Sequence, residues 1–273
     1  MRRGFSLVEL SIVLVILGLL VGGILAGRSL IRASELRSVA TQRDQYVTAI
    51  SAFRDKYFAL PGDMANAVRF WGAQAGGTAD GVDATCRGLD HTSPATGQAT
   101  CNGGGNGQIG YFQGGSGNVR YETFRAWQHL ANAGLLEGQY AGVASNNGMV
   151  LDYGWNVPAS RIQGAGFNLM HVGTNYNTHY YDANYQHVLF FGRQGGFHDV
   201  GMGPAIRPEE AWNIDSKLDD GLPASGRVMT ARYNHGGGDA GSALCADSIT
   251  PASANYALSD TTIRCALIFR LGF

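Results

Sequence analysis

The chain has 273 residues and a formal net charge of -1, and it combines few charged residues with many glycines. Charged residues make up 15% of the sequence, against about 25% in typical soluble domains, and the 40 glycines are about twice the usual share. The balanced charge excludes a large basic surface, so we expect no nucleic-acid partner. Length and composition favour one glycine- and turn-rich globular domain with a separate extended element.

The first predicted element is an apolar segment from Phe5 to Ala26. As an α-helix that rises 1.5 Å per residue, this segment would be about 33 Å long, which matches the hydrocarbon core of a bilayer. Arg2 and Arg3 precede it, and positive residues are retained on the cytoplasmic side of membranes. We therefore predict a single membrane-spanning helix with a cytoplasmic N-terminus and an exported remainder.

A cleaved secretory signal is the alternative to a retained helix, because it also joins a basic start to an apolar stretch. One feature against it is Glu9, which lies inside the apolar segment. A carboxylate there costs about 2.5 to 3.5 kcal/mol on insertion scales, so it needs a partner.

The second feature against a cleaved signal is an apolar periodicity that continues past Ala26 at helical three- and four-residue steps. Its members are Leu36, Val39, Ala40, Val47, Ile50, Phe53 and Tyr57. We therefore predict one helix from about Phe5 to Tyr57, ended by Pro61 and Gly62. Such a helix would be about 80 Å long, a length that suits an elongated assembly.

Residues 4–10, Gly4-Phe5-Ser6-Leu7-Val8-Glu9-Leu10, resemble the processing motif of type IV prepilins and type II secretion pseudopilins. The resemblance implies that a membrane peptidase cuts after Gly4 and methylates the new N-terminal Phe5, and that Glu9 is the glutamate of the fifth mature position. Cleavage would create an amino group on Phe5. In a low-dielectric helix bundle, Glu9 of a neighbouring subunit would pair with that amine, so that each buried charge has a partner.

This resemblance implies three parts of the chain: a leader at residues 1–4, a transmembrane and assembly helix at residues 5–58, and an exported, disulfide-bonded head at residues 59–273. The expected partners are prepilin peptidase, an inner-membrane assembly platform, and other pilins or copies of the same chain. Before assembly the chain would be a single-pass protein of the bacterial inner membrane. Afterwards it would lie in an extracellular filament or a periplasmic pseudopilus.

The favoured function is therefore a structural subunit, major or minor, of a type IV pilus-like filament. A type II secretion pseudopilin is the first alternative. An exported enzyme or binding protein held by one membrane anchor, with Glu9 incidental, is the second.

The helix departs from many pilins, which carry a proline in its first half, because this chain instead has Gly18, Gly22, Gly23 and Gly27. Glycine destabilises a helix interior by about 1 kcal/mol relative to alanine, so this stretch could melt or bend when the subunit leaves the bilayer. Alternatively, small residues allow close helix packing in membranes. Both interpretations stay open.

Beyond Pro61, short apolar segments alternate with glycine-, asparagine- and serine-rich turns. Helices are predicted from Tyr121 to Leu136 and from Pro208 to about Gly221. Aromatic and branched residues predict five strands: Gly148–Trp155, Gly166–Val172, His187–Arg193, Val228–Tyr233 and Ile263–Leu271. The predicted fold class is α+β, with the outer half of the N-terminal helix packed on a glycine-rich antiparallel β-sheet head.

The four cysteines form two sequence-local pairs, Cys86 with Cys101 and Cys245 with Cys265, which suits two disulfide loops in an oxidising compartment. Zinc is the alternative, but neither pair has the two- to four-residue spacing of a structural zinc site. The second pair lies beside the C-terminus, where pilins that this chain resembles commonly have a disulfide-bounded surface loop.

An oxygen-rich cluster of Asp215, Asp219 and Asp220 is the candidate metal site, because calcium sites occur in some members of the resembled family. The alternative is an acidic helix end with turn-forming aspartates beside Gly221. No other cofactor is expected.

We also predict that the chain is not an enzyme. The segment Gly105 to Gly110 fits the letters GxGxxG, but no strand-like run precedes it and no clear helix begins at it. The sequence contains neither a GxSxG elbow nor an HExxH pair.

Overall fold

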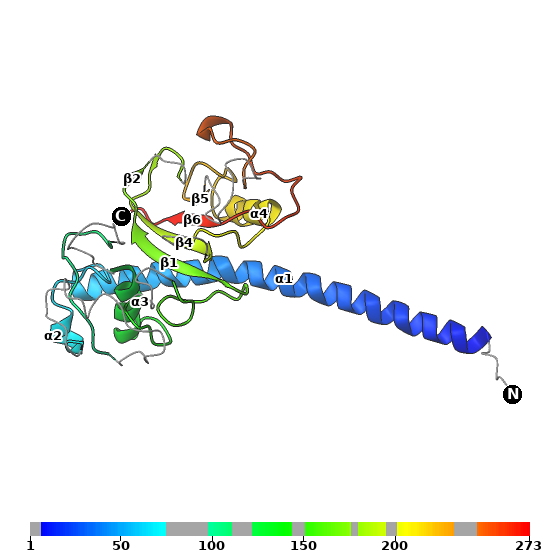
Figure 1. The fold of residues 1–273 in the computed structure, drawn as a ribbon, viewed down its shortest axis with the longest axis horizontal. Helices are drawn as coiled ribbons and strands as arrows, with labels where there is room; N and C mark the ends of the chain where they lie inside the picture. The colour runs from blue at the N-terminus through cyan, green and yellow to red at the C-terminus, as the bar shows by residue number, and fades with distance from the viewer. Residues whose placement is uncertain are drawn as a thin grey trace.

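The computed structural model describes residues 7–74, 98–110, 122–143, 151–175, 180–194, 201–231 and 245–273. Figure 1 shows one long helix, α1, that projects from an α+β head, with the sheet lying along its C-terminal half. The predicted leader at residues 1–4 and the predicted helix start at Phe5 lie outside the described residues.

Helix α1 runs without interruption from Leu7 to Tyr57, which confirms the prediction of one long helix. Its 51 residues correspond to about 77 Å. Only the outer half carries the apolar stripe that the head covers, and Val39, Ile50 and Phe53 are fully buried there. The helix ends where Phe58 enters the left-handed region at a φ of 52°, followed by the turn at Pro61 and Gly62.

The head contains a four-stranded antiparallel sheet in the order β1-β4-β6-β5. Its strands are β1 Ala165–His171, β4 His187–Arg193, β6 Leu267–Arg270 and β5 Val228–Thr230. In the central pairing Leu189 lies opposite both Leu169 and Phe269. A second, two-stranded sheet pairs β2 Thr174–Asn175 with β3 Ala183–Asn184. The antiparallel sheet therefore confirms the predicted fold class.

Both faces of the four-stranded sheet are covered, which explains why its central strand β4 reads as a continuous apolar run instead of alternating. Leu189 and Phe191 face the main core, which includes α1 and α3 residues. Val188 and Phe190 face a second cluster on the other side, with Tyr185. Successive side chains of a strand point to opposite faces, so each face takes every second residue.

Helix α3, Glu122–Asn132, packs beside α1 against the sheet and confirms the helix predicted there. Tyr46 of α1 joins the layers, because its ring lies 5.0 Å from that of Trp127 and 5.1 Å from that of Phe167, both edge to face. Such aromatic pairs contribute about 0.5–1.5 kcal/mol beyond the area they bury.

Three shorter elements complete the described fold. Helix α4, Pro208–Leu218, confirms the helix predicted to begin at Pro208, and Gly221 follows it at a φ of 74°. Helix α2 covers Val68–Trp71, and a 3-10 turn covers Pro251–Ser253.

The predicted strand at Gly148–Trp155 is wrong over its described residues, 151–155. The carbonyl oxygen of Asp152 accepts hydrogen bonds from the N–H groups of Trp155 and Asn156, both at 3.0 Å. The Asn156 side chain in turn accepts from the Asp152 N–H at 2.7 Å, and Gly154 has a φ of 93°. These local hydrogen bonds close a turn, and they outweigh the β-propensity of the apolar residues.

The predicted disulfide between Cys245 and Cys265 is confirmed, and both residues are buried. It closes the loop that precedes β6. Cys101 is also disulfide-bonded and buried. Cys86 lies outside the described residues, so its pairing with Cys101 stays a prediction.

Candidate functional site

The inner half of α1 is an apolar helix that the head does not cover. Every residue from Leu7 to Ala26 is exposed, and Figure 1 shows this part of α1 extending well beyond the head. Within the described part of the chain, α1 is the one helix long and apolar enough to cross a membrane. A helix that is apolar all round is stable only inside a membrane or a packed bundle, so this surface is the candidate assembly site.

Glu9 lies in the first described turn of α1, surrounded by exposed apolar side chains such as Leu7, Leu10 and Val13. The structure therefore places this carboxylate on the apolar surface of α1, which a membrane or a packed helix bundle must bury. Gly4 and Phe5, the predicted cleavage residues, lie outside the described residues.

The four helix glycines, Gly18, Gly22, Gly23 and Gly27, lie within the continuous α1. A Cβ atom added to any of them would meet no other heavy atom within 4 Å in the isolated chain. The fold of the single subunit thus does not require glycine at these positions. Any requirement for glycine there, whether for close packing or for flexibility on leaving the bilayer, would have to come from the assembled or membrane-bound surroundings of α1.

A bidentate ion pair fixes the point at which α1 leaves the head. Arg32 donates from Nε and Nη2 to the two carboxylate oxygens of Glu210, at 2.7 and 2.6 Å, and from Nη1 to Glu35 at 3.0 Å. Glu210 also accepts from the backbone N–H of Arg207, which caps the start of α4. Burial opposes the charged form of Glu210, but the hydrogen bonds from Arg32 and Arg207 outweigh it and lower its pKa.

The Arg32–Glu210 pair was not predicted from the sequence, because its partners are 178 residues apart. The position of Glu210, three residues after the N-cap of α4, was the available signal, since this is where a capping glutamate occurs. The pair ties α1 to the start of α4 at the place where α1 leaves the head.

The glycine-rich segment that fits GxGxxG binds carboxylates of the same chain. Asp63 accepts from the N–H groups of Asn106 and Gly107, at 3.1 and 2.7 Å. Glu122 accepts from Gly104 and Gly110, both at 2.6 Å. These backbone amides, which a phosphate would need, instead hold the start of α3 beside the end of α1.

Burial raises the pKa of Glu122 to about 7, although the two glycine N–H groups oppose the shift. Sequence reasoning did not identify Asp63 or Glu122. The hydrogen bonds from the backbone amides give both carboxylates a structural role.

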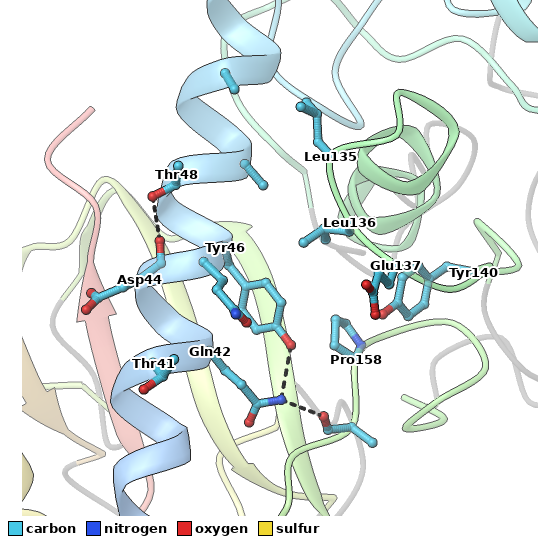
Figure 2. Close-up of a pocket in the computed structure, with 14 residues that line it drawn as sticks. Thr41, Gln42, Asp44, Tyr46, Thr48, Leu135, Leu136, Glu137, Tyr140 and Pro158 are labelled. Carbon is cyan, nitrogen blue, oxygen red and sulfur yellow. Dashed lines mark hydrogen bonds between the residues drawn. The ribbon is translucent and has the colours of Figure 1, made fainter.

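A groove of about 830 Å³ lies between the outer half of α1 and the segment that follows α3. Figure 2 shows Leu135 and Leu136 on one wall and Tyr46 and Gln42 on the other. Gln42 donates to the Ala159 carbonyl at 3.2 Å and to the Tyr46 hydroxyl at 3.5 Å. The groove lining contains neither histidine nor cysteine, and these hydrogen bonds tie α1 to its own head.

The predicted calcium ligands do come together, because carboxylate oxygens of Asp215, Asp219 and Asp220 lie within 4.8 Å of one another. However, five of the six oxygens accept hydrogen bonds from the protein. The donors are Tyr256 and Gly221 to Asp215, Arg227 and Val228 to Asp219, and Leu222 and Ser225 to Asp220.

Calcium needs six to eight oxygen ligands, and a carboxylate oxygen that accepts one hydrogen bond keeps a further lone pair, so the calcium site stays a prediction. The same hydrogen bonds fit the turn-forming alternative. The three aspartates close the turn after α4 and join it to β5 and to Tyr256.

Asp215 is expected to make head stability depend on pH. Burial, and secondarily the charges of Asp220 and Asp219, raises its pKa to about 7 from 3.8, against the hydrogen bonds of Tyr256 and Gly221. The folded head thus holds this proton more tightly than the unfolded chain. The resulting stabilisation is complete below the unfolded pKa and is lost as the pH rises through 7.

We therefore expect the free energy of unfolding of Asp215→Asn, relative to the wild type, to increase by about 2–3 kcal/mol from pH 5 to pH 8. Urea unfolding of the detergent-solubilised full chain at both pH values measures it. Glu137→Gln, which alters an exposed acid of the head, serves as the control. An offset between Asp215→Asn and wild type that stays constant with pH would contradict the prediction.

Comparison with known proteins supports the N-terminal part of this site. Residues 1–25 match the family model described as the prokaryotic N-terminal methylation motif. No curated protein and no solved structure matches the chain. The match covers Gly4, Phe5 and Glu9 and the first turns of α1, and it leaves the head outside it.

Proposed function

We propose that this chain, which carries the N-terminal methylation motif that is the signature of type IV pilins and pseudopilins, is a structural subunit of a type IV pilus-like filament. Prepilin peptidase would cut it between Gly4 and Phe5, and it would polymerise through α1. The observation that carries the proposal is the coincidence of this motif with a long helix whose first half is bare and apolar.

The energetics of the bare half support polymerisation. Burying one valine, leucine or isoleucine side chain is worth about 1.5–3 kcal/mol, and α1 exposes many of them between Leu7 and Ile31. A bilayer can bury this surface before assembly, which fits anchoring in the inner membrane. When a subunit leaves the bilayer, only the helices of other subunits offer an equivalent apolar surrounding.

The pairing of Glu9 with a neighbour's N-terminus would make each contact in the bundle depend on cleavage. A neighbour's Phe5 amine, freed by cleavage, would neutralise Glu9 within the bundle, so an uncut subunit would bring no amine to the pair. Expected partners are therefore prepilin peptidase, an inner-membrane assembly platform, and copies of this chain or other pilins.

Two alternatives remain beside the pilus subunit. A type II secretion pseudopilin would share the same motif and helix, but the large tip-type pseudopilin, which is nearest in size, typically lacks the glutamate that Glu9 supplies here. A membrane-anchored enzyme or binding protein would keep α1 as a simple anchor, and it would have no need of processing at Gly4.

Mass spectrometry of the N-terminus tests the proposal. We expect a mature chain that begins with N-methylated Phe5 and is recovered in fibres sheared from the cell surface. A variant that cannot be cut, Gly4→Leu, should insert into the membrane but stay out of fibres. An intact Met1 in the wild type, or a cut near Ala26, would refute the proposed maturation and favour an anchor or a secretory signal.

A further inference from the structure

Asn106 and Gly107 form an asparagine–glycine bond on the exposed surface of the glycine-rich segment. Such a bond is open to an intramolecular reaction, because the backbone nitrogen of the glycine can reach the side-chain carbonyl carbon of the asparagine. Glycine has no Cβ atom to hinder this approach. The five-membered ring that closes is a succinimide, and its formation needs no enzyme.

The only co-reactant is water. The backbone nitrogen of Gly107 loses its proton and bonds to the side-chain carbonyl carbon of Asn106, and the side-chain nitrogen leaves with that proton as ammonia. Water then opens the ring at either carbonyl, which leaves an aspartyl or an isoaspartyl residue at position 106. The segment thereby exchanges a neutral amide for a carboxylate beside Asp63.

The side-chain carbonyl of Asn106 is already arranged for this reaction. Its oxygen accepts a hydrogen bond from the N–H of Gln108 at 2.9 Å. A donor in this position stabilises the negative charge that the oxygen acquires when the Gly107 nitrogen adds to the carbon. Asn106, Gly107 and Gln108 are all exposed, so water can reach the ring.

The attacking nitrogen, in contrast, is held by the buried side chain of Asp63. One carboxylate oxygen accepts from the N–H of Gly107 at 2.7 Å, and the other accepts from the N–H of Asn106 at 3.1 Å. The nitrogen attacks only after it has lost its proton, and a carboxylate at this distance opposes the anion that would form. The two hydrogen bonds also fix the backbone on both sides of the Asn106 side chain.

Asp220 and Gly221 repeat this arrangement in the turn after α4. The side chain of Asp220 accepts from the N–H of Leu222 at 2.9 Å, and the N–H of Gly221 donates to the earlier carboxyl group of Asp215 at 3.3 Å. An aspartate before glycine closes the same ring with loss of water. Capture of the glycine N–H by an earlier aspartate therefore occurs in two separate turns of the head.

We propose that Asn106 is a latent deamidation site and that Asp63 keeps it unreacted by holding the N–H of Gly107. The reaction belongs to the head and is independent of the assembly that the chain joins.

Asn102 and Gly103 provide an internal control in the same segment. The N–H of Gly103 donates to the Met64 carbonyl at 2.8 Å, and the side chain of Asn102 accepts from the N–H of Val68 at 3.0 Å. Gly103 is buried, and a Cβ atom added to it would lie 2.2 Å from the Gly62 carbonyl oxygen, so the backbone there has no room to move. Asn102 should therefore react only when the head unfolds.

The first test is peptide mass spectrometry of the detergent-solubilised full chain after incubation at neutral pH, with and without urea. In the folded wild type, Asn106 should deamidate at least tenfold more slowly than in urea. In urea, Asn102 and Asn106 should react at similar rates, because both precede glycine. A folded wild type in which Asn106 reacts as fast as in urea would overturn the inference.

The second test is Asp63→Asn, because an amide of the same shape offers only one acceptor oxygen for the two N–H groups. We expect Asn106 to deamidate at least tenfold faster than in the wild type, while Asn102 stays unreacted. Glu122→Gln is the matched control, since it alters another carboxylate bound by the same segment but leaves the partner of Gly107 unchanged.

A further variant, Asp63→Ser, removes the carboxylate without adding an amide donor, and it serves if Asp63→Asn reacts at Asn102 as well. An unchanged rate at Asn106 in a folded Asp63 variant, or an equal acceleration in Glu122→Gln, would overturn the role of Asp63. Equal reaction of Asn102 and Asn106 in both Asp63 variants would also overturn it, because the fold as a whole would then protect Asn106.

Discussion

Replacing Glu9 by alanine is expected to leave membrane insertion and cleavage intact and to reduce incorporation into fibres by more than tenfold. Without the carboxylate, the Phe5 amine of a neighbouring subunit would enter the apolar bundle uncompensated. Breaking a buried pair by removing one partner costs about 3–5 kcal/mol, and each 1.4 kcal/mol corresponds to about tenfold. The measurement is the ratio of mature chain in sheared fibres to mature chain in the membrane fraction.

Two variants make the Glu9 result specific. Glu9→Asp keeps the charge on a shorter side chain and should retain part of the incorporation. Glu137→Ala removes an exposed acid of the head and should behave as the wild type. If Glu9→Ala enters fibres at the wild-type ratio, the pairing of Glu9 with the mature N-terminus is refuted.

Replacing Gly62 by alanine is expected to unfold the head or to lower its stability by more than 3 kcal/mol, because two costs add. Gly62 has a φ of 85°, which L-residues rarely adopt. A Cβ atom there would also lie 2.2 Å from the Glu122 carbonyl oxygen and 3.0 Å from the Ala126 nitrogen, both backbone atoms of α3. Urea unfolding followed by tryptophan fluorescence measures the loss.

Gly72 offers a matched control for Gly62, because its φ of 84° is almost the same while its added Cβ would meet nothing within 4 Å. Gly72→Ala should therefore cost only the conformational strain, about 1–3 kcal/mol, because a ψ of 154° at this φ is a backbone region essentially confined to glycine. Equal losses in the two variants would mean that the close approach of α3 to Gly62 contributes nothing to stability.

Gly62 and the glycines of α1 are subject to different constraints, one from the fold of a single subunit and the other from outside it. Gly62 is required by the fold of one subunit, because the backbone of α3 fills the place of its side chain. Gly18 and Gly22 meet nothing in the isolated chain, so any constraint on them comes from the membrane or from other subunits. We therefore expect alanine at Gly62 to impair folding of the head, and alanine at Gly18 or Gly22 to leave the head unaffected.

The sequence by itself determined the features that depend on local order along the chain. The continuity of α1, its division into an apolar and an amphipathic half, and the position of Glu9 follow from composition and helical periodicity alone. The same holds for β4, whose apolar run has the predicted bounds. Local patterns suffice here because one segment contains all the information that these elements need.

Only the tertiary structure decided which distant residues meet. The Arg32–Glu210 pair, the backbone amides that hold Asp63, and the hydrogen bond from Tyr256 to Asp215 all join segments far apart in sequence. The turn at Asp152 is different, because it rests on a side-chain hydrogen bond from only four residues away, a local feature that the apolar pattern did not reveal. A residue's periodicity shows whether it is buried, but it does not identify the partner, since that depends on how separate elements pack.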